Sequence, residues 1–211
     1  MLKSKVEEIL IELNKVYNNP KAALNFSNTF ELLVAVVLSA QCTDVRVNKV
    51  TSELFKTYNT PEQFAKLTED ELYPLIKSCG LGNSKAKGII ATSKILVEKF
   101  NGQVPGDLET LRTLPSVGRK TANVIASVGF GIPAIAVDTH VFRVANRIGL
   151  ANANNVLKTE MQLQENIPME MWSLSHHLLI FHGRNVCKAQ NPQCDKCTIK
   201  NLCEHCDMDK K

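Results

Sequence analysis

The 211-residue sequence contains little glycine and proline, ten and eight residues respectively, and no low-complexity segment, so we expect no long disordered tracts. No apolar run reaches the ~18–20 residues that a membrane span requires, and no internal repeat is present. The first seventeen residues, MLKSKVEEILIELNKVY, mix charges of both signs with apolar positions, which is not the pattern of a secretory signal. These absences favour a globular, cytoplasmic protein without a membrane segment.

Alternation of apolar and polar residues, the pattern of a β-strand, is almost absent as well. Apolar residues recur instead at helical spacing, and residues 30–38 are apolar on nearly every face, which predicts a buried central helix. The segment 132–137 is the only candidate strand and is better interpreted as an extended linker. Other helices are expected to begin near Asp44, Pro61, Glu69, Ser84, Asp107, Gly118, Asp138, Val156 and Met171. The predicted fold class is all-α.

The net charge of +4 is weak evidence for any partner, but its distribution is more informative. Between residues 112 and 147, Asp138 is the single acid and the cations are Arg112, Arg119, Lys120, Arg143 and Arg147. Such a stretch suits a polyanion. A solvated basic surface without a ligand is the alternative interpretation.

Cysteines are concentrated at one end of the chain. Cys187, Cys194, Cys197 and Cys203 give the pattern C-x6-C-x2-C-x5-C, and Cys206 follows closely. A reducing compartment disfavours disulfides, so ligation is the leading interpretation: four thiolates in a compact loop can hold a [4Fe–4S] cluster or tetrahedral zinc. The spacing is far shorter than that of a zinc ribbon, which favours the cluster.

Residues 111–130 read as two short helices joined by a tight turn at Pro115, Ser116, Val117 and Gly118. Such a turn presents backbone N–H groups and a helix N-terminus outward, a geometry that holds a phosphate without reading any base. The alternative is a packing element of two helices with no ligand.

Lys120 follows this turn and is adjacent to Arg119. A helix N-terminus and a neighbouring cation both disfavour a further positive charge, so both favour the neutral amine, which is the nucleophilic form. Asp138, eighteen residues later, is expected to be the N-cap of the next helix. Taken alone, the pair could be a phosphate contact and a cap.

Both residues lie in segments, GRKTAN at 118–123 and AVDTHVFRV at 136–144, that resemble the endonuclease III family of helix–hairpin–helix DNA-repair glycosylases. LSAQCTD at 38–44, CGLGNSKA at 79–86 and the cysteine spacing match the same family, so the resemblance covers nearly the whole chain. Ser116 departs from it, because the family usually has a glycine there, and we expect a slightly altered turn.

The resemblance implies removal of oxidised or ring-damaged pyrimidines from duplex DNA, followed by cleavage of the strand at the abasic site. Lys120 would attack C1′ and form a Schiff base, and the ionised Asp138 would assist it and stabilise positive charge on the sugar. The damaged nucleotide must leave the duplex, at a cost of a few kcal/mol. Gln41 would fill the vacated space and Leu81 would wedge between bases, unless they are a surface glutamine and a leucine folded onto the core.

The resemblance also implies a [4Fe–4S] cluster on Cys187, Cys194, Cys197 and Cys203, with Cys206 left over. Lys196 and Lys200, between these ligands, would contact DNA phosphates together with residues 115–119 of the turn. Two helical lobes are implied: residues 22–132, with six helices including the hairpin, and residues 1–21 with 133–211, which carry the cluster. We expect a monomer associated with the nucleoid, with Lys120 and Asp138 facing each other across a cleft.

Three alternatives remain. A mismatch adenine glycosylase of the same superfamily usually lacks the lysine at the position of Lys120 and has a further C-terminal domain, whereas this sequence has the lysine and ends eight residues after Cys203. A non-enzymatic DNA-binding iron–sulphur module would explain the basic stretch but not the matched pair of Lys120 and Asp138. An electron-transfer protein would not need the hairpin.

Overall fold

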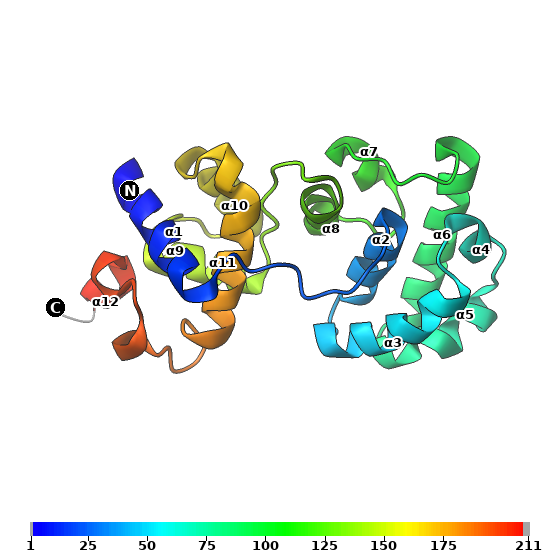
Figure 1. The fold of residues 1–211 in the computed structure, drawn as a ribbon, viewed down its shortest axis with the longest axis horizontal. Coiled ribbons are helices and arrows are strands. Elements are labelled where there is room, and N and C mark those ends of the chain that lie inside the picture. Colours follow the sequence, from blue (N-terminus) through cyan, green and yellow to red (C-terminus); the bar gives the residue numbers. More distant parts are fainter. Residues whose placement is uncertain (1, 209–211) are drawn as a thin grey trace. The chain divides into compact units, whose positions relative to one another are not determined.

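The computed structural model describes residues 2–208, which consist of helices and connecting loops without a β-strand (Figure 1). This confirms the all-α prediction. The chain forms two compact units. We call Ala23–Ile132 the hairpin unit, and Met1–Ala22 together with Pro133–Lys211 the cysteine unit. Within residues 2–208, none of the helices is both long and apolar enough to cross a bilayer.

The hairpin unit is built around α2, whose residues from Phe30 to Leu38 are all buried, as predicted. This helix contacts α3, α6 and α8, and the longest helix, α6, also packs against α4 and α5 (Figure 1). The helices of the unit are α2 (Thr29–Leu38), α3 (Asp44–Thr57), α4 (Pro61–Ala65), α5 (Glu69–Ile76), α6 (Gly82–Phe100), α7 (Leu108–Thr113) and α8 (Arg119–Val124), with a 3-10 helix at Lys77–Cys79 and a π-helix at Ile125–Gly129.

The helix ends in this unit follow local sequence signals. Thr68 and Glu71 form a capping box at the start of α5, and the same reciprocal pair of bonds begins α4 at Thr60. After α6, Asn101 adopts a left-handed backbone, and the N–H of Gly102 donates to the carbonyl of Leu96 at 2.9 Å. The dipeptide is therefore a helix C-cap.

The cysteine unit joins the two ends of the chain around one apolar core. Val6, Ile9, Leu10 and Leu13 of the first helix are buried in the same core as Leu178 and Ile199. The segment Pro133–Val137 has neither helix nor strand, in agreement with the expected linker. The helices of the unit are α1 (Lys3–Tyr17), α9 (Thr139–Ile148), α10 (Val156–Asn166), α11 (Trp172–Asn185) and α12 (Glu204–Met208), with 3-10 turns at Met169–Met171, Cys194–Lys196 and Lys200–Leu202.

Candidate functional site

The hairpin turn connects α7 to α8 through residues 114–118. Leu114 and Val117 anchor the turn in the core, at 3% and 4% exposure, and the N–H of Val117 donates to the carbonyl of Leu114 at 3.1 Å. Gly118 begins α8 without a capping side chain. The first-turn N–H groups of a helix have no acceptor within the helix, so this turn has the form required to bind an anion.

Ser116 holds the turn in a left-handed backbone, with φ of 62°. Glycine takes this conformation more easily, and an L-residue there costs about 1–2 kcal/mol. The side chain of Ser116 is accommodated by Gly88 of α6, because a Cβ added at Gly88 would lie 2.8 Å from the Cβ of Ser116 and closer still to its Oγ. Thr92, one turn further along α6, donates its hydroxyl to the carbonyl of Pro115 at 2.6 Å.

This packing predicts that Gly88→Ala affects stability differently in the wild-type protein and in the Ser116→Gly variant. Gly88→Ala alone should lower the free energy of unfolding by up to about 2 kcal/mol, because a clash of ~1–3 kcal/mol is set against the ~1 kcal/mol that alanine contributes inside a helix. With Ser116→Gly present the clash disappears, so the double variant should be at least as stable as the Ser116→Gly variant. Denaturant unfolding of the four proteins measures both effects. Equal losses in the two backgrounds would show that Gly88 does not accommodate Ser116.

Lys120 is the second residue of α8, and its side chain is exposed. No carboxylate pairs with it within residues 2–208. It therefore stands beside the hairpin turn with its amine accessible to a ligand.

Asp138 belongs to the cysteine unit and is the N-cap of α9, as predicted. Its Oδ1 accepts a hydrogen bond from the N–H of Val141 at 2.8 Å, and its carbonyl accepts from Phe142 at 2.8 Å. The side chain is half-buried. Because the cap uses one carboxylate oxygen, the helix fixes the orientation of this group.

Gln41 and Leu81 both have a left-handed backbone, with φ of 54° and 53°. Gln41 lies in the turn between α2 and α3 and is exposed, whereas Leu81 precedes the first residue of α6 and is 54% exposed. The alternative of a leucine folded onto the core is therefore wrong. Two conformationally restricted loops present an amide and an apolar side chain to the exterior.

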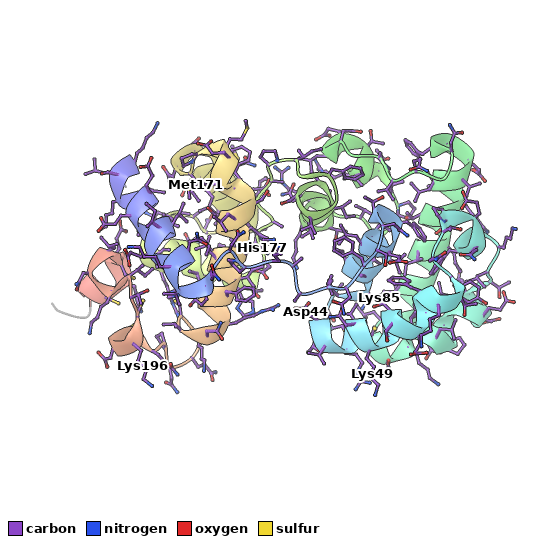
Figure 2. All side chains as sticks on the ribbon, in the orientation of Figure 1. Asp44, Lys49, Lys85, Met171, His177 and Lys196 are labelled. Carbon is purple, nitrogen blue, oxygen red and sulfur yellow. The ribbon has the colours of Figure 1, made fainter. Side chains whose placement is uncertain are left out.

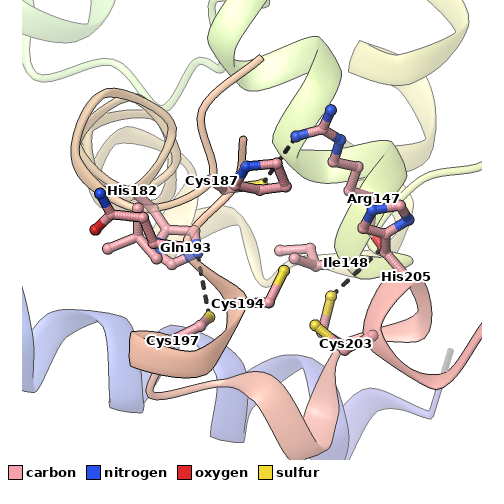
Figure 3. Close-up of a pocket in the computed structure, with 12 residues that line it drawn as sticks. Arg147, Ile148, His182, Cys187, Gln193, Cys194, Cys197, Cys203 and His205 are labelled. Carbon is pink, nitrogen blue, oxygen red and sulfur yellow. Dashed lines mark hydrogen bonds between the residues drawn. The ribbon is translucent and has the colours of Figure 1, made fainter. Parts of the chain in front are cut away.

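Five cysteines of the cysteine unit line one apolar cavity, shown in Figure 3: Cys187, Cys194, Cys197, Cys203 and Cys206. Arg147 donates from Nη1 to Sγ of Cys187 at 3.7 Å, and Nε2 of His182 lies 3.6 Å from Sγ of Cys197. N–H donors of this kind are common beside ligating thiolates.

Tyr17 determines how His182 faces the sulphur. The Tyr17 hydroxyl lies 3.0 Å from Nδ1 of His182, and burial, followed by the nearby Cys197 and Cys187, raises the pKa of Tyr17 to about 12. Burial also lowers the pKa of His182 to about 4, so the ring is neutral near pH 7. A protonated hydroxyl donating to Nδ1 leaves the proton on Nε2, which then donates to Cys197.

The donor set fits a cluster held by thiolates. Burial, and then the neighbouring Cys203, Cys187 and Cys194, raise the pKa of Cys197, while the N–H of Ile199 opposes the shift, so these sulphurs lie close enough to interact. Burial also raises the pKa of Cys206 to about 12, with contributions from Cys194 and Cys203. Within residues 2–208, no group of three or more histidine, cysteine or carboxylate side chains is arranged so that it could hold a single metal ion.

Two lysines lie on the loop formed by these cysteines. Lys196, labelled in Figure 2, is exposed. Lys200 pairs with Asp195 at 2.9 Å, and this bond raises the pKa of the lysine. An exposed ion pair of this type is weak, so a phosphate can compete for Lys200.

Two arginines of the basic stretch between residues 112 and 147 bind backbone carbonyls at and near the cysteine loop. Arg143 donates to the carbonyls of Cys187 and Gly183, at 3.1 and 3.0 Å, and Arg147 donates to that of Lys188 at 2.6 Å. The sequence did not indicate these contacts, nor that His182 lies beside Cys197. The partners are about 40 residues from the two arginines, so no local pattern connects them.

The chain matches the model of the HhH-GPD superfamily of base excision DNA repair proteins over residues 34–169. It is 51% identical over 200 residues to endonuclease III of Rickettsia conorii, covering 95% of each chain. It is 49% identical over 205 residues to endonuclease III of Escherichia coli K12, covering 97% of each chain. The chain belongs to the endonuclease III family.

A solved structure extends this similarity to three dimensions. The structure of a trapped endonuclease III–DNA covalent intermediate covers the whole of both chains, with a TM-score of 0.93 and 47% identity. Members of the endonuclease III family are DNA glycosylases with AP lyase activity, and this protein is therefore an enzyme of base excision repair.

Proposed function

We propose that the protein releases oxidised or ring-damaged pyrimidines from duplex DNA and cleaves the strand on the 3′ side of the resulting abasic site. The observation that carries the proposal is the exposed Lys120, placed in the first turn of α8 directly after the hairpin. A phosphate held by the turn fixes the DNA backbone next to this amine. The similar solved structure holds endonuclease III joined covalently to DNA, and such a bond requires a nucleophile on the protein.

The amine of Lys120 acts as the nucleophile. Its nitrogen forms a bond to C1′ as the bond between C1′ and the base breaks, and the base leaves with the electron pair and takes up a proton. Opening of the sugar gives a Schiff base, and loss of a proton from C2′ then expels the 3′ phosphate by β-elimination. Hydrolysis of the Schiff base by water regenerates Lys120.

Asp138 supplies negative charge where the sugar becomes positive. The carboxylate must remain ionised for this role, and it also favours proton transfer away from the attacking amine. The bond from Val141 restrains the side chain of Asp138 before substrate binds. A group held in this way does not need to reorganise during the reaction.

Gln41 and Leu81 stabilise the DNA from which the nucleotide has been extruded. The amide of Gln41 offers a donor and an acceptor to the unpaired base, and the exposed side chain of Leu81 replaces part of the lost stacking. Residues 115–119 bind phosphate, and Lys196 and Lys200 add further phosphate contacts from the cysteine loop.

Cys187, Cys194, Cys197 and Cys203 hold a [4Fe–4S] cluster in this proposal, and the bound cluster contributes folding energy to the loop that carries Lys196 and Lys200. Because Cys206 lines the same cavity, the ligand set is testable. We expect Cys206→Ser to keep the visible absorption and iron content of the purified protein, and Cys187→Ser to lose both. The reverse result would assign the fourth ligand to Cys206.

Borohydride trapping on a duplex with one oxidised thymine tests the function. We expect a covalent protein–DNA adduct that maps to Lys120 in the monomeric protein. Release of the base without an adduct would indicate a glycosylase that uses water, as expected of the adenine-specific branch of the superfamily. DNA binding without either product on any lesion would leave only a binding module.

A further inference from the structure

Lys85 is a buried lysine in the hairpin unit, labelled in Figure 2, with 4% of its surface exposed. Its Nζ donates to three backbone carbonyls, those of Leu38 at 2.8 Å, Ala40 at 2.7 Å and Cys79 at 2.9 Å. An ammonium group has three N–H bonds, so each proton has one acceptor. In the described part of the chain, no carboxylate pairs with this lysine.

A buried cation with neutral partners is an uncommon arrangement, because lysine is rarely buried without a charged partner. Burial lowers the pKa of Lys85, and the nearby Cys42 and Cys79 oppose that shift. An apolar side chain in this position would avoid the desolvation penalty. The location of the three carbonyls therefore indicates the structural role of Lys85.

These carbonyls belong to the two loops that present Gln41 and Leu81. Leu38 is the last residue of α2 and Ala40 directly precedes Gln41, while Cys79 ends the 3-10 turn two residues before Leu81. The two loops are about 40 residues apart in sequence, and the amine of Lys85 bonds to both. Their tips have the left-handed backbone described above, which needs support from neighbouring structure.

The same face of α6 also supports the hairpin turn. Lys85, Gly88 and Thr92 are spaced by three and four residues and therefore share one helix face. Gly88 accommodates Ser116, and Thr92 bonds to Pro115. Helix α6 thus holds the two loops and the phosphate-binding turn in fixed positions relative to one another.

We propose that Lys85 is a positioning residue that sets Gln41 and Leu81 at the distance from the hairpin turn at which both can enter the duplex. The inference rests on the proposed function of those two residues in DNA. Lys85 acts through the loops and does not contact the substrate. Its loss affects extrusion of the nucleotide more than binding of the backbone, since the turn is held separately by Gly88 and Thr92.

Lys85→Met removes the amine and nearly preserves side-chain length. We expect single-turnover base release from a paired lesion to fall by about tenfold to a hundredfold, as for a displacement of roughly 1 Å in a reacting complex. Affinity for an undamaged duplex should remain within about twofold, because it depends on phosphate contacts. Leu96→Ala, a buried core substitution on the same helix, serves as a stability control at temperatures where both variants are folded.

A double-mutant cycle with Leu81→Ala separates positioning from general destabilisation. Because Lys85 also bonds to the loop of Gln41, the double variant should be slower than Leu81→Ala alone, but by less than the product of the two single losses. Multiplication of the two losses, or a loss in Leu96→Ala equal to that in Lys85→Met, would overturn the proposal in favour of a purely structural lysine.

The same measurements distinguish the positioning role of Lys85 from the proposed function of the two loops. No effect of Leu81→Ala or Gln41→Ala would contradict the proposed role of those residues in DNA. A loss in Leu81→Ala with none in Lys85→Met would contradict only the positioning role. If Lys85→Met does not fold, Lys85→Arg retains a cation, but its planar donors cannot converge as one amine does. Wild-type base release by the arginine variant would then overturn the inference.

Discussion

Replacement of Lys120 by glutamine should reduce strand cleavage at an abasic site by at least about a thousandfold, because the amide cannot form a Schiff base. A thousandfold loss corresponds to about 4 kcal/mol of barrier. Glutamine is uncharged but retains a polar side chain at the start of α8, where the exposed lysine makes no ion pair within the described chain. Folding and binding to lesion DNA should therefore change little.

The measurement is single-turnover cleavage of a preformed abasic site, with borohydride trapping of the same samples. Lys94→Gln is a matched control, since Lys94 is an exposed lysine on α6 away from the hairpin turn. We expect wild-type cleavage and trapping from this control. Cleavage at the wild-type rate by Lys120→Gln would exclude Lys120 as the nucleophile.

Asp138→Asn should slow base release by about 10²–10³-fold, the loss typical of removing one preorganised electrostatic group, with almost no effect on stability. The structure makes this separation possible, because Asp138 caps α9 through one oxygen that accepts from Val141. Asparagine is as good an N-cap as aspartate, so the helix start is preserved while the charge is lost.

Asp138→Ala is the companion variant, because alanine removes both the charge and the cap and should cost a further ~1 kcal/mol of stability. Thermal unfolding and single-turnover base release, measured on both variants, assign the two roles. Wild-type base release by the asparagine variant would remove the charge of Asp138 from the mechanism. Equal destabilisation by both substitutions would show that the cap depends on the charge.

Helix boundaries could be predicted wherever a side chain within three or four residues determines them. Thr68 with Glu71, Asp138 before α9 and the end of α6 at Asn101 are examples. The residues proposed to carry out the reaction could be inferred from sequence motifs, because Lys120 and the hairpin turn lie within a few residues of each other. The outward position of Leu81 was implied by the family resemblance and not by a local pattern.

The contacts that hold the loops and the hairpin turn in place could not be inferred from the sequence in the same way. Lys85 bonds to carbonyls 45 and 47 residues away, and its sequence neighbourhood resembles that of any surface lysine on a helix. The space that Gly88 leaves for Ser116 depends on the packing of α6 against the hairpin turn. Such contacts arise only when distant segments meet, and no local pattern encodes them.

The joining of both chain ends in the cysteine unit has a consequence for biosynthesis. The apolar face of α1 is synthesised well before Ile199 and Cys203, which share its core and are made roughly 190 residues later. At ~5–20 residues per second, that face waits about 10–40 seconds for its partners. The hairpin unit is contiguous and can fold during this interval. Assembly of the cysteine unit must therefore wait for the segment that carries Ile199 and Cys203, by which time the hairpin unit has had time to fold.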